Sequence, residues 1–234
     1  MISGVYKMNR QYHKSIFAFL DLLGVKENIK KDTGEFLNKL GAIYDSTLRV
    51  YKSVCKREFK DSIRTKIFSD NIVFECEIRN GDGFEEFKQI AFISAILQEE
   101  LLENNLLLRG AITIGESYLD DVLVFGKTLS EAYILESTTA LYPRVIISKE
   151  LTKIVCQNKL FLPPISYMCV LDRDGEYYID YLSSAGRNKN QREKLLRSAL
   201  AYNEKELRCS DYSAKVKQKL LWHNDYLKMK QNQL

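Results

Sequence analysis

The sequence Ser15-Ile16-Phe17-Ala18-Phe19-Leu20-Asp21-Leu22-Leu23-Gly24 is a compact apolar run that ends in an aspartate. A second stretch, Thr65-Lys66-Ile67-Phe68-Ser69-Asp70-Asn71-Ile72-Val73-Phe74, places Asp70 in a turn between two β-prone runs. These patterns predict a central strand and a hairpin. We expect the strand to lie beside the hairpin, which would bring the carboxylates of Asp21 and Asp70 together. Two such carboxylates favour a site for Mg²⁺ or Mn²⁺, ions that usually carry substrate phosphates.

Each aspartate also has a local explanation. Asp21 could cap the helix that follows it, and Asp70 could be an ordinary turn residue. Their order along the chain favours the metal site when the two are taken together. Lys66 lies four residues before Asp70 on the same strand face, and two interpretations stay open for it: a contact to a base or phosphate, or an exposed strand lysine.

The composition limits the classes of function. The chain has 234 residues with 45% hydrophobic content, which suits one α/β domain, alone or with a helical appendage. Five cysteines without a CxxC motif argue against a zinc site or a redox pair. Only His13 and His223 are present, which argues against a histidine metal cluster, and against a Ser-His triad unless one of them is the base. No run has signal-peptide or membrane-spanning length, so we expect a soluble cytoplasmic protein without a membrane partner.

The net charge of +4 comes from 35 basic and 31 acidic residues, and most of the excess follows Arg187. We interpret these basic residues as solvated helix faces and expect no nucleic-acid partner, because interleaved aromatics and glycine loops are missing; a nucleic-acid patch is the alternative.

Hydrophobic periodicity predicts the order β-α-β-β-α-β-β-α-β-α-β-β, followed by helices. This order indicates an α+β fold with a mostly antiparallel sheet and helices on one face, an elaborated ferredoxin-like arrangement. We divide the chain into a catalytic domain over residues 1–186 and a C-terminal helical extension over residues 187–234 that packs on the same domain.

Several of these pieces resemble the class III nucleotidyl cyclases, over roughly residues 14 to 182. That family has an apolar strand ending in Asp, then an apolar pair and Gly, as in 19–24 of this chain. It has a Lys-x-x-Gly-Asp hairpin, matched at 66–70 with Ser69 in place of Gly. An Arg-x-Gly-Ile-x-x-Gly strand is matched loosely at 109–115. A helix opened by Gly126, carrying Ala132 and Glu136, follows, and then the strand 145–147 with Ser148.

The closest resemblance is to the stand-alone pyrimidine cyclases of the bacterial Pycsar anti-phage system, which carry a helical C-terminal extension. The resemblance implies conversion of UTP or CTP to a 3′,5′-cyclic monophosphate and pyrophosphate, with two Mn²⁺ or Mg²⁺ ions per site. It also implies a homodimer with active sites at the interface, and a separate effector that the cyclic product activates.

The resemblance and the residues together give a set of candidate site residues. Asp21 and Asp70 are the predicted catalytic and metal-binding residues. The predicted substrate-binding residues are Lys66, Phe19, Gly24, Ser69, Lys127, Ser130 and Arg144.

Three departures from the family pattern bear on this prediction. Ser130 and Ile134 stand where class III cyclases carry an Asn and an Arg, and Ile134 cannot replace a guanidinium. Leu123 stands where the family carries its base-selecting Asp. A basic residue elsewhere must then stabilise the phosphorus centre, and the candidates are Lys127, Arg144, Arg173 and Arg187. Two other functions stay open: a catalytically silent cyclase-like domain that binds a nucleotide or acts as a sensor, and a polymerase-like or nuclease-like protein.

Overall fold

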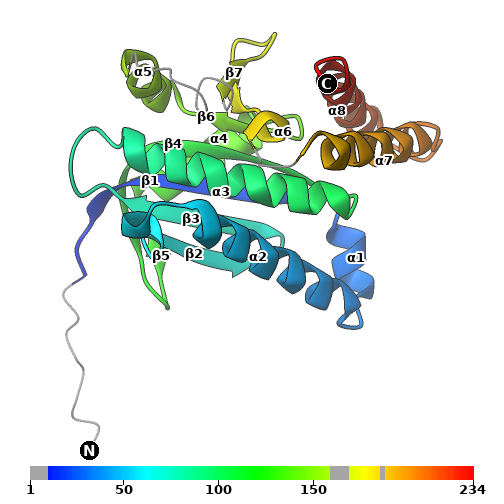
Figure 1. Ribbon diagram of the computed structural model, residues 1–234. Helices are drawn as coiled ribbons and strands as arrows, with labels where there is room; N and C mark the ends of the chain where they lie inside the picture. The colour runs from blue at the N-terminus through cyan, green and yellow to red at the C-terminus, as the bar shows by residue number, and fades with distance from the viewer. Residues whose placement is uncertain (1–9, 159–168, 185–187) are drawn as a thin grey trace, which may run out of the picture.

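The computed structural model describes residues 10–158, 169–184 and 188–234 (Figure 1). Its eight strands are β1 (His13–Leu23), β2 (Ile63–Phe68), β3 (Asn71–Glu77), β4 (Leu107–Leu119), β5 (Val124–Phe125), β6 (Val145–Ile147), β7 (Cys169–Leu171) and β8 (Tyr177–Ile179). Its helices are α1 (Lys26–Lys31), α2 (Glu35–Val54), the 3₁₀ turn η1 (Arg57–Phe59), α3 (Phe84–Glu103), α4 (Lys127–Thr138), α5 (Lys149–Gln157), α6 (Tyr181–Ser184), α7 (Lys189–Leu207) and α8 (Ala214–Gln231).

The sheet is continuous and mostly antiparallel, in the order β2-β3-β1-β4-β6-β8-β7, with β5 added to the far end of β4. Only the β4–β6 pair is parallel among the described strands. β1 lies at the centre and pairs with both β3 and β4. Its residues Ile16 to Leu20 are almost completely buried, because both faces of a central strand are covered.

Helices cover both faces of this sheet. On one face, α2 and α3 pack over the side chains of β1 and β3 that include Ile16, Ala18 and Phe74, which form the main hydrophobic core (Figure 1). The alternate residues of β1, Phe17 and Phe19, point to the opposite face, where they pack with residues of β3, β4 and α4. A strand buried on both sides needs an apolar layer on each side, so α4 takes the second face.

The C-terminal helices α7 and α8 pack against each other, and α7 also packs against α3. Leu195, Leu196 and Leu227 belong to the main core, so the extension shares the core of the sheet domain. The predicted boundary between residues 186 and 187 falls in 185–187, outside the described residues, and the division into two parts stays a prediction. Within the described ranges, none of the helices combines the length and the hydropathy that a membrane span needs.

The predicted α+β fold is confirmed, with differences in detail. The hairpin β2–β3 and helix α5 lie where the sequence places them. The expectation that helices gather on one face is wrong for α4, for the packing reason given above. The short helix α1 was not expected, because its sequence Lys26-Glu27-Asn28-Ile29-Lys30-Lys31 has too few apolar residues for a helical pattern.

Candidate active site

The strand β1 and the β2–β3 hairpin bring Asp21 and Asp70 next to each other. Asp21 lies directly opposite Asn71 in the β1–β3 register, and Asn71 follows Asp70 in the chain. The hairpin turn is held to β1 by a hydrogen bond of 2.9 Å from the Leu22 amide to the Asp70 carbonyl oxygen. The charge of Asp70 acts on Asp21 and adds to the rise in its pKa. The turn that carries Asp70 is therefore hydrogen-bonded to the end of β1, and the two carboxylates are close enough to interact electrostatically.

Arg109 holds Asp21 in place from the neighbouring strand. It lies opposite Asp21 in the β1–β4 register and donates from Nε to Asp21 Oδ2 at 3.1 Å. Its Nη2 lies 2.5 Å from Glu136 Oε1 on α4, and its Nη1 donates to the Ala140 carbonyl oxygen at 3.4 Å. One guanidinium thus links β1, β4 and both ends of the segment from Glu136 to Ala140.

Burial raises the pKa of both acids in this network. Burial raises the pKa of Asp21, and the hydrogen bond and charge of Arg109 oppose the rise. Burial also raises the pKa of Glu136 to about 6, again against the charge of Arg109 and with that of Asp21. Arg109 donates to Oδ2 of Asp21, and a side-chain hydrogen bond between Asp21 and Glu136 adds to the rise in the pKa of Glu136.

Two hairpin residues are predicted to bind substrate: Lys66 in β2 and Ser69 in the turn next to Asp70. Lys66 points toward the β4–β5 loop, where its ammonium donates to the Asp121 carbonyl oxygen. Ser69 occupies the turn with φ +56°, a left-handed conformation that favours glycine. Such a conformation accounts for the Gly of the Lys-x-x-Gly-Asp pattern, and Ser69 adopts it here as a turn residue.

The other predicted substrate residues lie in different surroundings. Phe19 is only 5% exposed and packs edge-on against Tyr133 with 5.7 Å between ring centroids, so it belongs to the core. Gly24 ends β1 with φ +74° and borders open space. Lys127 is 84% exposed and pairs with Glu131 at 3.5 Å on the solvent side of α4. Ser130 lies exposed on the same helix. Phe19 and Lys127 are not brought to the two aspartates in a position to bind a ligand.

Arg144 does not fit its predicted substrate role. Its side chain is 0% exposed and forms ion pairs with Asp172 and Asp174. Its guanidinium also lies 5.5 Å from the centroid of the Trp222 ring and 5.7 Å from that of Tyr178. Such a cation, paired and stacked inside the protein, serves the fold.

Arg173 and Arg187 are the two remaining candidates for stabilising the phosphorus centre. Arg173 is exposed in the β7–β8 turn, and Arg187 lies outside the described residues. A different cation approaches the site instead: Lys219 of α8 interacts electrostatically with Asp21 and Glu136. No local pattern could have identified Lys219, because its proximity depends on how α8 packs.

The two carboxylates fit a divalent cation whose remaining ligands would come from substrate and water. Among the described residues no group of three or more His, Cys, Asp and Glu side chains could hold a metal. Two adjacent carboxylates, one of them with a raised pKa, are nevertheless the hard oxygen donors that Mg²⁺ and Mn²⁺ take, together with phosphate oxygens. The residues that would hold such an ion are Asp21 and Asp70.

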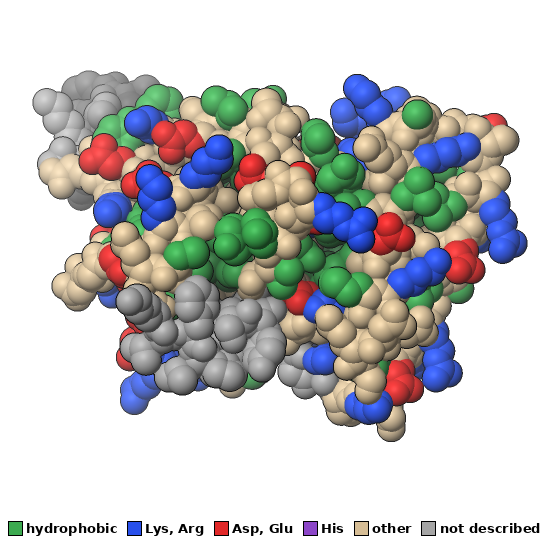
Figure 2. All heavy atoms as spheres, turned by 90° about the horizontal axis from the view of Figure 1, so that it is seen from above, with side chains coloured by type: hydrophobic (Ala, Val, Ile, Leu, Met, Phe, Trp, Pro, Cys, Tyr) green, Lys and Arg blue, Asp and Glu red, His purple; other side chains and the backbone are tan. Residues whose placement is uncertain are grey.

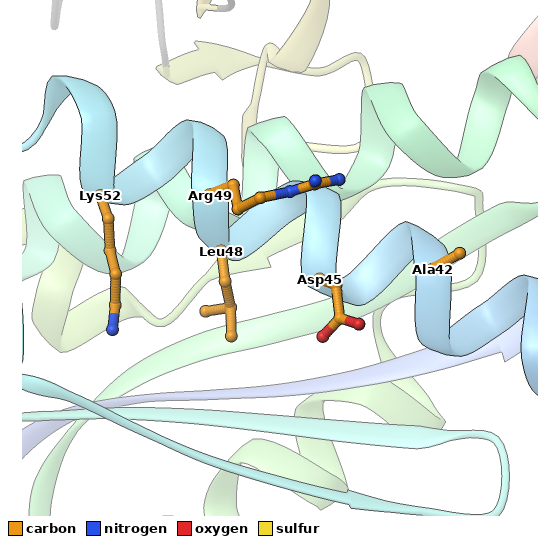
Figure 3. A pocket seen from close by; sticks show the side chains of 5 residues that line it. All are labelled: Ala42, Asp45, Leu48, Arg49 and Lys52. Carbon is orange, nitrogen blue, oxygen red and sulfur yellow. The ribbon is translucent and has the colours of Figure 1, made fainter.

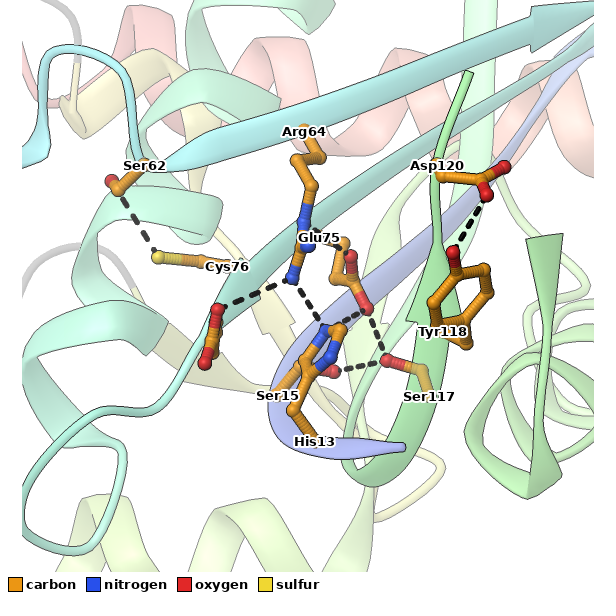
Figure 4. Close-up of polar contacts among 10 residues, drawn as sticks. His13, Ser15, Ser62, Arg64, Glu75, Cys76, Ser117, Tyr118 and Asp120 are labelled. Carbon is orange, nitrogen blue, oxygen red and sulfur yellow. Dashed lines mark hydrogen bonds and ion pairs between the residues drawn. The ribbon is translucent and has the colours of Figure 1, made fainter. Parts of the chain in front are cut away.

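A second polar cluster lies toward the other end of β1 (Figure 4). Glu75 is fully buried and binds His13 Nε2 at 2.9 Å, Arg64 Nε at 2.9 Å and the Ser117 hydroxyl. Ser117 and Ser15 bind each other at 2.6 Å. His13 contacts the carboxylate and the arginine but neither serine in this cluster, so the arrangement is not a hydrolytic triad.

The surface carries little else that indicates a site. A hollow beside α2 is lined by Ala42, Asp45, Leu48, Arg49 and Lys52, all from one helix, and their side chains do not converge (Figure 3). Over the C-terminal helices, scattered acidic side chains lie among more numerous basic ones on the face seen in Figure 2. This mixed surface favours solvated helix faces over a nucleic-acid patch.

Comparison with solved structures identifies the fold. The adenylyl cyclase CyaB from P. aeruginosa is similar over 78% of this chain and 98% of its own, with 16% identity and a TM-score of 0.51. The guanylyl cyclase Cya2 matches over 78% of this chain and 98% of its own, with 16% identity and a TM-score of 0.49. A cyclase from Silicibacter pomeroyi, described as an adenylate/guanylate cyclase/hydrolase, matches over 72% and 95% with 14% identity and a TM-score of 0.45.

The chain has the fold of a class III nucleotidyl cyclase. At this level of identity the likeness concerns the fold, and the CyaB comparison carries it. No protein-family model and no curated protein sequence matches the chain. Within this class III cyclase fold, Asp21 and Asp70 lie at the end of the central strand and in the adjoining hairpin turn.

Proposed function

We propose that the chain is a nucleotidyl cyclase that converts UTP or CTP to the 3′,5′-cyclic monophosphate and pyrophosphate. The observation that carries this proposal is the juxtaposition of Asp21 and Asp70 on the class III cyclase fold. The pyrimidine preference is supported by Leu123, which is 39% exposed and offers an apolar side chain where a purine-selecting carboxylate would stand. The signalling role in anti-phage defence, the cytoplasmic location and the separate effector rest on the sequence resemblance.

The reaction needs no protein nucleophile. The ribose 3′-oxygen attacks the α-phosphorus in line, the new P–O bond forms, the bond to pyrophosphate breaks, and the hydroxyl proton leaves to solvent. A divalent cation bound by Asp21 and Asp70 would supply charge neutralisation at the phosphate oxygens. Arg109 fixes the orientation of Asp21 through its bond to Oδ2. The contribution of the protein is therefore positioning and electrostatics.

A homodimer is part of the proposal. Exposed apolar residues gather on α4, on the β2–β3 hairpin and around β5: they are Ile67, Phe68, Val122, Leu123, Phe125, Tyr133 and Ile134. A surface of this kind favours contact with a second copy of the chain. Since Ser130 and Ile134 do not supply an Asn and an Arg, the partner would shape the site chiefly through apolar contact.

The decisive experiment incubates the purified chain with each of the four NTPs and Mn²⁺ and measures cyclic products and pyrophosphate by mass spectrometry. We expect cyclic UMP or cyclic CMP. Asp70→Asn should reduce the rate at least about 100-fold, in the range seen when a charge-stabilising group is removed. It should leave the fold intact, because its carboxylate receives its one side-chain bond among the described residues from Asn71. Asp61→Asn, at a side chain 90% exposed, is the matched control and should keep full activity.

A catalytically silent nucleotide-binding domain is the second candidate. Ile134 is 54% exposed on α4, so the position that carries an Arg in the similar cyclases presents an apolar side chain here. This function predicts that an NTP binds in the presence of Mn²⁺ and that none of the four gives a cyclic product. That result would overturn the cyclase proposal.

A further inference from the structure

The C-terminal helices form one wall of a groove that begins where β1 ends. The groove has a volume of about 250 Å³, and its lining includes Leu23, Gly24 and Leu107 from the sheet side and Tyr202, Lys219 and Leu220 from α7 and α8. Leu23 and Gly24 follow Asp21 closely in the chain. The groove therefore lies between the end of the strand that carries Asp21 and the C-terminal extension.

Lys219 is the basic residue of α8 that lines this groove. Its side chain is half-buried, and within the described part of the chain no hydrogen bond or ion pair involves its ammonium. Burial lowers the pKa of Lys219, the charge of Arg109 lowers it further, and the charges of Asp21 and Glu136 raise it. These charged neighbours are the residues of the candidate active site, so the ammonium lies within electrostatic reach of it while it remains free to bind an anion.

The position of Lys219 is fixed by the packing of α8. One turn further along the helix, Trp222 stacks on Tyr142 and on Tyr226 with 5.6 Å between ring centroids in each case. The Trp222 indole donates to Asp172 Oδ2 at 2.8 Å. Near the end of the helix, the buried ammonium of Lys230 pairs with Asp180. A helix anchored at both places holds Lys219 at the groove without help from a bound ligand.

The other basic residues expected near the phosphates do not compete for this role. Arg144 is committed to two buried ion pairs, and Lys127 faces solvent on α4. Arg109 is engaged with Asp21 and Glu136. Lys219 is thus the cation near Asp21 that the described residues leave without an ion-pair partner.

We propose that Lys219 binds the β- and γ-phosphates of the substrate, so that α7 and α8 complete the triphosphate site in the same chain. This inference rests on the proposed function for the identity of its ligand. It assigns the C-terminal extension a direct part in substrate binding, in addition to its packing role. A compact ammonium on a flexible stem suits phosphate oxygens without demanding a fixed planar geometry.

The test measures binding of inorganic tripolyphosphate with Mg²⁺ to the full chain by isothermal titration calorimetry. Lys219→Met keeps the length of the apolar stem and removes the charge, and we expect it to weaken binding at least about 10-fold, as for loss of one charge-assisted hydrogen bond. Lys219→Arg, which keeps the charge, should bind within about threefold of the unmodified chain. Lys228→Met alters an exposed lysine of the same helix and should bind as the unmodified chain does.

Thermal unfolding of each variant separates binding from stability. Unchanged tripolyphosphate affinity in folded Lys219→Met overturns the proposal, and so does a chain that does not bind tripolyphosphate at all. If Lys219→Met does not fold, Lys219→Gln takes its place with the same expected loss. The binding test and the cyclase assay can fail separately. If tripolyphosphate binding depends on Lys219 but no cyclic product forms, the role of Lys219 is supported and the proposed function is wrong. If cyclic product forms and Lys219→Met leaves both the tripolyphosphate affinity and KM unchanged, the proposed function is supported and the role of Lys219 is wrong.

Discussion

Replacing Arg109 with Met removes the cation that Asp21 and Glu136 share. The side chains of Arg109 and Asp21 are each 18% exposed and that of Glu136 is 4% exposed, so the network is largely withdrawn from water. Removal of one partner from a buried ion pair costs about 3–5 kcal/mol, whereas an exposed pair contributes about 0–1 kcal/mol. Because two of the three groups keep some contact with solvent, we expect a loss of about 3 kcal/mol in the free energy of unfolding. For a chain of this size the loss corresponds to a decrease of about 6–12 °C in Tm.

The loss should depend on pH, with a definite sign. Glu136 has a folded-state pKa of about 6, above its ordinary value of 4.5. Its protonation therefore favours the folded state, fully below pH 4.5, and this contribution disappears as the pH rises through 6. Without the charge of Arg109, which lowers the pKa of both acids, their ionised forms become less favourable still. We expect a large decrease in Tm at pH 8 and less than half of it at pH 5, where Glu136 is mostly protonated.

Thermal unfolding followed by circular dichroism at both pH values measures this difference. Lys127→Met is the control, because it removes an exposed ion pair with Glu131 and should change the stability by at most about 0.5 kcal/mol at either pH. Equal decreases in Tm at pH 5 and pH 8 would contradict the electrostatic reasoning. A loss below about 1 kcal/mol at pH 8 would mean that the network behaves as a surface pair.

Three further substitutions test the backbone and packing arguments, each by urea unfolding. Ser69→Gly should stabilise the chain by about 0.5 kcal/mol, since it relieves a φ of +56° in the hairpin turn; destabilisation would show that the serine side chain contributes more than the strain costs. Gly126→Ala should destabilise by about 2 kcal/mol or more, because φ is +136° and a Cβ would lie 2.7 Å from the Glu116 carbonyl oxygen. Its control, Gly41→Ala in α2, meets nothing within 4 Å and should stabilise by about 0.5–1 kcal/mol. Arg144→Met should cost about 3–5 kcal/mol as a broken buried pair, and a change under 1 kcal/mol would contradict the assignment of Arg144 to the fold.

Local pattern was sufficient for the elements that form the centre of the site. The apolar run before Asp21 predicts a buried strand, and the turn at Asp70 predicts a hairpin, because alternation and turn residues act over a few positions. The same reasoning placed the helices on one face. It could not see that Phe17 and Phe19 require a second apolar layer, which α4 supplies.

The individual binding residues were less accessible to sequence reasoning. Arg144 has the charge that a phosphate site needs, and only the fold shows that it pairs with Asp172 and Asp174 across a distant hairpin. Arg109 was visible as part of a motif, yet its bonds to Asp21 and Glu136 depend on strand register and on the position of α4.

By itself, the sequence determined the strand that ends at Asp21, the turn that carries Asp70 and the α+β order of elements, since these depend on side-chain periodicity and turn chemistry along a continuous stretch of chain. Only the tertiary structure decided which cations stand near the aspartates. Ion pairs and the approach of Lys219 are set by the packing of segments far apart in the sequence, and the free energy that selects them comes from burial in the assembled core.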